Sequence, residues 1–252
     1  MKKVNWGKLI LVLFLLLFVG IIANIVMAFY GSPVTKIYAT WQIRDYVEKT
    51  YPDMNLEVPK AGYNFKFGEY VSHVQSPTSA DTKFSVSWKK GEIYDYYEMD
   101  VLKRDTTYRR LQEELSNIVE EAISREFPYQ TSIVFADAVK STGDFSMLTL
   151  DMPLDTMTVP LPTSLVVYYY HEQLDYDVFS KILIELSDIM NRNNIRIDYY
   201  SVVMEETPEE GEKPTSGDKI HLFDFPAEKI VSDNLAEDIK MHMEVWESEH
   251  EK

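Results

Sequence analysis

The feature that most constrains this chain is a run of 22 uncharged residues near its start, Leu9–Tyr30. A helix of about 20 apolar residues crosses the hydrocarbon layer of a membrane, which is about 30 Å thick. Trp6 and Tyr30 stand near the two ends of the run, where aromatic side chains favour the membrane–water interface. The run therefore predicts that residues 1–30 form a cytoplasmic head and a transmembrane anchor.

Two other interpretations of the run compete with an anchor. In a cleaved signal peptide the apolar region has about 7–15 residues and ends at a small-residue cleavage site. Val26-Met27-Ala28 is an acceptable site, but the run is longer than a signal peptide needs. A core helix of a soluble domain would need a polar face, which the run lacks. We therefore expect the mature protein to keep residues 9–30 in the lipid bilayer.

The lysines around the run bear on its orientation. Lys2, Lys3 and Lys8 precede it, and Lys36 and Arg44 follow it within 15 residues. The excess on the N-terminal side is slight, but a short basic head before a large body is typical of exported signal-anchor proteins. The sequence thus predicts a single-pass protein of the cell membrane whose C-terminal body lies outside the cytoplasm.

The chain is acidic, with 25 Lys+Arg against 41 Asp+Glu and a net charge of −16. Residues 31–252 carry −19, because the first 30 residues carry +3. This balance argues against nucleic acid and against anionic membrane surfaces as main partners, since both repel an acidic protein at long range. The absence of cysteine excludes disulfides, thiolate zinc sites and a cysteine nucleophile.

Hydrophobic periodicity predicts an α+β body behind the anchor. Pro128 ends a long helical pattern, so we place a first domain at residues 31–128 and a second at residues 129–252. In each small domain we expect helices packed on an antiparallel sheet. The expected elements of the first domain are a helix at 33–51 capped by Ser32, strands at 63–67, 84–88 and 92–101, and a helix at 107–127.

The second domain follows the same plan, although no residue-level repeat relates the two. One helix is expected from an Asp177 cap to Asn193-Asn194, and another at 226–249. The expected strands lie at 132–138, 157–161, 165–170, 195–204 and 219–225. The segment Glu205–Gly217 holds five glutamates and no large apolar residue, so we expect a mobile acidic loop there.

No motif for catalysis or cofactor binding occurs in the chain, since GxxxxGKS/T, GxGxxG, HExxH and GxSxG are all absent. The acidic segments Asp95–Asp100 and Asp175–Asp177 lack the glycine turn typical of calcium loops. Ser76, Ser79 and Asp81 are the most suggestive group for hydrolysis, but their pattern favours a local turn. We therefore predict no catalytic residue, no cofactor and no metal.

Tyrosine is in excess, with 17 residues, and several fall in pairs or triplets on expected strands. Because strand side chains alternate between the two faces, each pair places one ring inward and one outward. Outward tyrosines among carboxylates suit the binding of peptides, sugars or cationic groups, whereas the alternative is that all these rings enlarge a small core. The candidate binding surface comprises Tyr94, Tyr96, Tyr168, Tyr170 and Tyr200.

Three segments resemble a known family. They read GSPVTKIYATWQIRDYVEKTYPDMNL at Gly31–Leu56, SPTSADTKFSVSW at Ser76–Trp88 and DTTYRRLQEEL at Asp105–Leu115. In these segments the chain resembles the YfjL-like family, membrane-anchored proteins of Gram-positive bacteria whose function is unassigned. The resemblance extends more weakly over the rest of the body. It implies an anchor followed by two small α+β domains, and it supplies no catalytic residue.

These observations favour a non-enzymatic binding or interaction module of the cell envelope, whose partner is another envelope protein. Two alternatives stay open. One is an envelope hydrolase whose site carries no familiar motif, and the other is a structural accessory subunit of a membrane complex.

Overall fold

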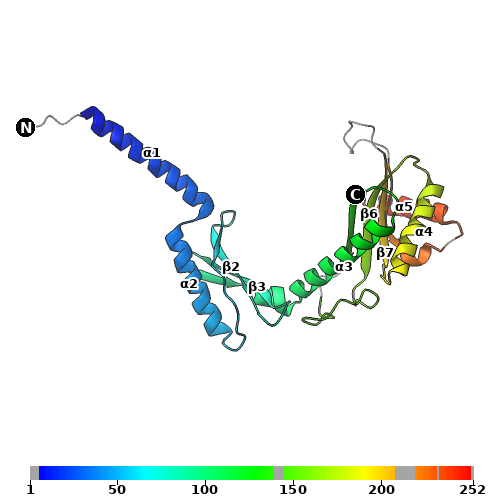
Figure 1. Ribbon diagram of the computed structural model, residues 1–252, viewed down its shortest axis with the longest axis horizontal. Coiled ribbons are helices and arrows are strands. Elements are labelled where there is room, and N and C mark those ends of the chain that lie inside the picture. Colours follow the sequence, from blue (N-terminus) through cyan, green and yellow to red (C-terminus); the bar gives the residue numbers. More distant parts are fainter. Residues whose placement is uncertain (1–5, 139–144, 208–218, 232, 251–252) are drawn as a thin grey trace, which may run out of the picture. The chain divides into compact units, whose positions relative to one another are not determined.

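The computed structural model describes residues 6–138, 145–207, 219–231 and 233–250 (Figure 1). The chain divides into two compact units, Met1–Thr106 and Thr107–Lys252, which are described separately below. The first unit begins with α1 (Trp6–Tyr30), the one helix in the described part of the chain that is long and apolar enough to cross a membrane. Every residue from Ile10 to Tyr30 is exposed, so the interpretation of this run as a core helix is wrong.

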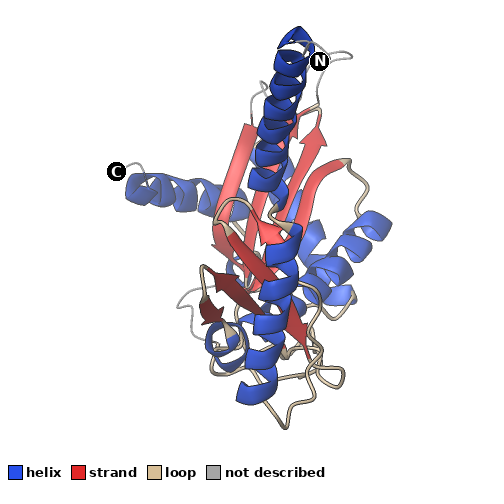
Figure 2. Cartoon of the chain, turned by 90° about the vertical axis from the view of Figure 1, so that its left-hand side faces the viewer, coloured by secondary structure: helices blue, strands red, loops and turns tan. Residues whose placement is uncertain are grey.

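The rest of the first unit is one helix on an antiparallel sheet, as predicted. The helix α2 (Pro33–Thr50) begins where expected: Ser32 is the N-cap and its Oγ accepts a hydrogen bond from Thr35 N at 3.4 Å. It packs on one face of a four-stranded sheet, and Figure 2 shows it in front of the strands. The strand order is β1 (Gly62–Asn64), β2 (Glu69–Gln75), β3 (Lys83–Lys89) and β4 (Glu92–Asp95).

Two features of this sheet differ from the prediction. The strand β2 was not anticipated, although its buried Tyr70, Ser72 and Val74 alternate with less buried neighbours. The strand predicted at 92–101 ends at Asp95, whose Oδ1 accepts a hydrogen bond from Tyr97 N at 2.8 Å and turns the chain. A short π-helix, η1 (Glu98–Leu102), follows instead of the second half of the strand.

The second unit is built on a mixed sheet. Its elements are α3 (Asp105–Glu126), β5 (Thr131–Ala138), β6 (Thr163–His171), α4 (Tyr176–Arg192), β7 (Tyr199–Glu206), β8 (Lys219–Pro226), the 3-10 turn η2 (Ala227–Lys229) and α5 (Leu235–His250). The strand order is β5-β6-β7-β8, and β6 and β7 are parallel while the outer pairs are antiparallel. The α+β class is confirmed, but this sheet is mixed because α4 carries the chain back to the same end before β7.

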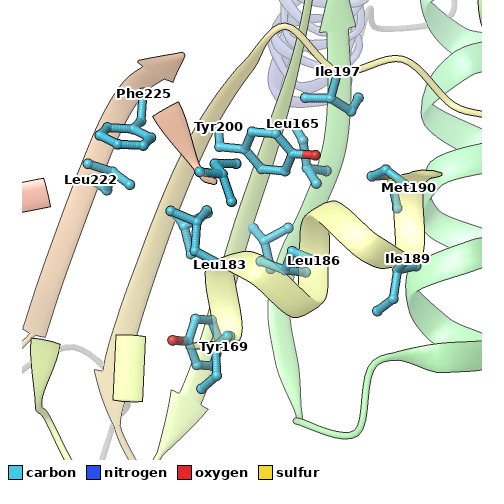
Figure 3. Close-up of a cluster of buried hydrophobic side chains, with 14 of the residues drawn as sticks. Leu165, Tyr169, Leu183, Leu186, Ile189, Met190, Ile197, Tyr200, Leu222 and Phe225 are labelled. Carbon is cyan, nitrogen blue, oxygen red and sulfur yellow. The ribbon is translucent and has the colours of Figure 1, made fainter. Parts of the chain in front are cut away.

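The three helices of the second unit share one core. Apolar side chains of α3, α4 and α5 pack with the same face of the sheet, including the buried Leu165, Leu183 and Leu222 (Figure 3). Leu115, Val119 and Ile123 of α3 belong to this cluster. The structure therefore divides the chain at Thr106/Thr107 and not at 128/129, because the apolar stripe of α3 is buried in the second unit.

Smaller differences concern where elements begin. Asp175, and not Asp177, caps α4 through hydrogen bonds from Asp177 N and Val178 N to its Oδ1. Residues 157–161 form turns in place of a strand, β7 begins at Tyr199 in place of Ile195, and the last helix begins at Leu235 after η2. In the predicted loop, Glu205 and Glu206 extend β7, while residues 208–217 lie outside the described residues.

Candidate functional site

Tyr94 and Tyr96 lie on the first unit, Tyr94 on the face of β4 turned away from α2 and Tyr96 directly after the end of this strand. Tyr94 stands opposite Ser87 on β3, and its hydroxyl donates to Glu92 Oε2 at 2.6 Å. This hydrogen bond to a carboxylate raises the pKa of Tyr94 above its ordinary value. Both rings are exposed, as the hypothesis of a tyrosine surface requires.

The neighbouring Asp95 points to the opposite face and has a structural role. Its Oδ2 accepts hydrogen bonds from the hydroxyls of Tyr46 at 2.9 Å and Tyr51 at 2.6 Å. Burial, followed by the contact with Asp95, raises the pKa of both phenols. With these partners the carboxylate joins α2 to the sheet, and no group of three or more acidic or histidine side chains in the described residues is placed to hold a metal.

On the second unit, the strand β6 separates a core face from an open face. Tyr169 is buried in the core with its alternate neighbours on the strand, while Tyr168 and Tyr170 are half-buried on the other face. Ile133 of β5 pairs with Tyr168, and Phe135 pairs with Val166. We call the set Ile133, Phe135, Val166, Tyr168 and Tyr170 the open face.

The open face is apolar at its β5 edge. Ile133 and Phe135 are 43% and 38% exposed, although large apolar side chains of a sheet are usually covered. The buried side chains of α3, α4 and α5 pack with the other face of the sheet. On the side of Tyr168, the contacts of α5 are with β8, where Trp246 meets Phe223 and Glu247 meets His221. Since β8 is at the opposite edge from β5, these contacts leave Ile133 and Phe135 exposed. Contiguous exposed apolar side chains are a feature of protein interaction sites.

The structure contradicts the placement of Tyr200 on a surface. Tyr200 is 2% exposed and lies among Leu165, Leu183 and other core residues (Figure 3). Burial raises its pKa to about 12. The core face of β7 takes Tyr200, Val202 and Met204, so the adjacent Tyr199 is the ring on the opposite face, where it is half-buried.

The structure does not assemble a recognisable hydrolytic site in the residues that it describes. A cavity of about 600 Å³ lies between α3 and β5, lined by Glu120, Ser124, Tyr129 and Gln130 among others, and it contains no histidine. Ser76 Oγ and Ser79 Oγ accept hydrogen bonds from Thr78 N and Thr82 N, which is the local turn predicted.

One serine does meet a histidine. His73 Nδ1 and Ser85 Oγ are 3.1 Å apart across β2 and β3. Asp100 Oδ2 accepts from the backbone N–H of Ser85 at 3.1 Å, so this contact of Asp100 does not orient the imidazole. A Ser-His-Asp triad also needs a carboxylate on the second imidazole nitrogen, which this contact does not supply.

These features define a two-unit α+β protein with an apolar N-terminal helix and with exposed apolar side chains at the β5 edge of its second sheet. The YfjL-like N-terminal domain matches residues 6–96, and the YfjL-like C-terminal domain matches residues 114–240. The chain belongs to the YfjL-like family. The second match begins within α3, so it groups most of this helix with the second unit, as the structure does.

A curated relative gives the same assignment. The chain is 27% identical over 152 residues to the uncharacterized protein YfjL of Bacillus subtilis (strain 168). The aligned region is 58% of this chain and 61% of the relative's length. No solved structure gives a significant match to the chain.

Proposed function

We propose that this protein is anchored in the cell membrane by α1, with its body outside the cytoplasm, and that its open face binds another envelope protein without catalysis. The observation that carries the proposal is the exposure of Ile133 and Phe135 beside Tyr168, at the β5 edge of a sheet whose buried helix side chains pack on the other side. Tyrosine adds a large apolar ring with a polar end, which suits a partly wet interface.

The charge of the second unit indicates the chemistry of the partner. Residues 107–252 contain 12 Lys+Arg and 30 Asp+Glu, a net charge of −18. A partner with an apolar centre and basic surroundings would be attracted at long range and would complement the open face at contact. Raising the salt concentration should then slow association more than it speeds dissociation.

Photo-crosslinking in intact cells tests this proposal. A photoreactive amino acid at Phe135 should yield a discrete crosslinked protein, because the partner covers this residue. Ile184 on α4 is the matched control, since it is 41% exposed on the same unit but lies on another surface. Tyr168→Asp should remove the Phe135 crosslink. Equal crosslinking from both positions, or none from Phe135, would contradict a specific site on the open face.

The alternatives have separate tests. An envelope hydrolase would depend on the contact between His73 and Ser85, so Ser85→Ala should abolish any hydrolytic activity of the purified chain. A structural accessory subunit would need its own α1, whereas a simple anchored binding module would keep its function when α1 is replaced by an unrelated transmembrane helix.

A further inference from the structure

Specific contacts, and not a loose linker, join α1 to the rest of the first unit. Gly31 is buried with φ +72°, and a Cβ added there would lie 2.6 Å from Tyr63 Cγ. The Tyr70 hydroxyl accepts from Ser32 N at 2.8 Å and donates to Ser32 O at 3.2 Å. These contacts fix the end of α1 against the sheet that follows it.

The topology determines which end of the first unit meets α1. In an antiparallel meander the β1–β2 and β3–β4 turns lie at the same end of the sheet, and Tyr70 pairs with Trp88 there. The β1–β2 turn reaches the last helical turn of α1, because the rings of Phe29 and Phe65 are 5.7 Å apart (Figure 1). We call this end, with the first turn of α2, the α1-proximal end.

The α1-proximal end combines exposed apolar side chains with cations. Phe65 and Phe67 are 62% and 56% exposed at the tip of the β1–β2 turn, and Val34 and Ile37 are exposed on α2. Lysines accompany them: Lys66 Nζ lies 5.6 Å from the centre of the Phe67 ring, and Lys36, Lys89 and Lys90 occupy the same end. Aromatic rings flanked by lysines are typical of the membrane–water interface.

Carboxylates are scarce at this end. The first acidic residue of the whole chain is Asp45, in the second half of α2. Glu69 and Glu92 are the first residues of β2 and β4. Glu69 Oε1 accepts a hydrogen bond from Asn64 Nδ2 at 3.3 Å, and Glu92 Oε2 accepts one from the Tyr94 hydroxyl at 2.6 Å. The local field is therefore favourable for anionic groups.

The overall acidity of the chain does not oppose this conclusion. Residues 31–106 contain 10 Lys+Arg and 11 Asp+Glu, a net charge of −1, whereas residues 107–252 carry −18. Long-range repulsion from anionic membrane surfaces therefore acts on the second unit and not on the first.

We propose that the α1-proximal end lies in the headgroup layer of the leaflet where α1 ends, with Phe65 and Phe67 in the interface and Lys36 and Lys66 on anionic phospholipid headgroups. The proposal rests on the proposed anchoring by α1. The membrane thereby fixes the orientation of the first unit, since the contacts at Gly31 leave little freedom between α1 and the sheet. Two features favour the bilayer as the surface that this end contacts: the end follows α1 directly, and it is positively charged.

Spin labels can test this in the full chain, because it contains no cysteine and each introduced cysteine is labelled alone. The chain is reconstituted in vesicles of phosphatidylcholine with phosphatidylglycerol, and nitroxides are placed by Phe67→Cys, Asp53→Cys and Leu16→Cys in separate variants. We expect the label at 67 to collide more with oxygen than with a water-soluble nickel chelate. The label at 53, on the loop after α2 at the opposite end, should show the reverse.

The lysines are tested in the Phe67→Cys background. An interfacial lysine contributes about 1 kcal/mol on an anionic surface, so Lys36→Ala with Lys66→Ala should lower the ratio of membrane-apposed to detached states about 30-fold. Vesicles of phosphatidylcholine alone should show little difference between this variant and its parent. The matched control removes Lys83 and Lys103 from the opposite end of the unit and should leave the ratio unchanged.

The outcomes separate this inference from the proposed anchor. A water-exposed label at 67 with a bilayer-embedded label at 16 would overturn the inference and leave the anchor intact. A water-exposed label at 16 would overturn both. Shielding of position 67 in native membranes but not in the vesicles would also overturn it and would indicate a protein on this surface.

Discussion

Gly31 is the residue on which the junction between α1 and the first unit depends most. Gly31→Ala places a methyl group against Tyr63 and Tyr70 in a left-handed conformation, so we expect a loss of about 2–4 kcal/mol in the free energy of unfolding. Gly68→Ala is the control, because its φ is +65° but nothing lies within 4 Å of the new Cβ. It should lose only about 1–2 kcal/mol. Urea unfolding in detergent measures both, and equal losses would contradict the close contact at Gly31.

Tyr169 carries a buried hydroxyl with no hydrogen-bond partner in the described residues. Burial accordingly raises the pKa of this phenol. Tyr169→Phe removes the unsatisfied oxygen and should stabilise the protein by about 1 kcal/mol. Tyr70→Phe should instead destabilise it, because the Tyr70 hydroxyl bonds both Ser32 N and Ser32 O. Urea midpoints compare the two variants, and a loss of stability in Tyr169→Phe would reveal a partner for its hydroxyl.

The same tyrosines show what sequence can predict for single residues. Alternation correctly predicts that neighbours such as Tyr168 and Tyr169 face opposite sides. It does not say which of them faces the core, because that depends on where α4 packs. The choice of the outward ring within each pair was therefore open, and it was right for Tyr168 and Tyr170 but wrong for Tyr200. Ile133 and Phe135 were missed as candidates because exposed apolar residues look like core in a sequence.

Among the elements, α3 and α4 are joined at their C-terminal ends by Glu126. Its Oε1 accepts from Asn193 Nδ2 at 2.8 Å and from Arg125 Nη2 at 2.9 Å, and Arg192 Nη2 reaches Oε2 at 3.2 Å. The Asn193 hydrogen bond first, and then that of Arg125, lowers the pKa of Glu126 from 4.5 to about 2.

The lowered pKa of Glu126 predicts a pH dependence. The unfolded state binds the proton first as the pH falls, so the carboxylate stabilises the fold above about pH 4.5 and this contribution is lost towards pH 2. The stability difference between wild type and Glu126→Gln should therefore be largest near neutral pH and disappear in acid. Glu121→Gln, on the same helix, controls for removal of one carboxylate. A difference that stays constant from pH 7 to pH 2 would contradict this role.

The order of helices and strands was predictable where a strong period or a Pro or Gly signal was present, as at Ser32-Pro33 and Pro128. The parallel pairing of β6 and β7 was not, because side-chain alternation is the same in parallel and antiparallel strands. The strand β2 was missed because Ser72 and His73 break its hydrophobic pattern. Ser72 is nevertheless buried, since its Oγ donates to Pro59 O at 2.9 Å.

For the whole molecule, the division at Thr106/Thr107 predicts which fragments fold. Residues 107–252 should unfold cooperatively as an isolated fragment, whereas residues 129–252 should not. The shorter fragment loses Leu115, Val119 and Ile123 from the core, and each buried side chain contributes about 1.5–3 kcal/mol. Their sum is comparable to the total stability of a domain, about 5–15 kcal/mol. Thermal melts followed by circular dichroism check this, and a cooperative melt of 129–252 would restore the boundary at Pro128.

We propose that α1 anchors a body that lies outside the cytoplasm. The most direct measurement is labelling of single cysteines in intact cells with a membrane-impermeant maleimide. We expect that Asp53→Cys is labelled in intact cells, that Lys3→Cys is labelled only after lysis, and that both proteins stay in the membrane after alkaline extraction. The reverse labelling pattern, or a soluble protein beginning at Phe29, would contradict it.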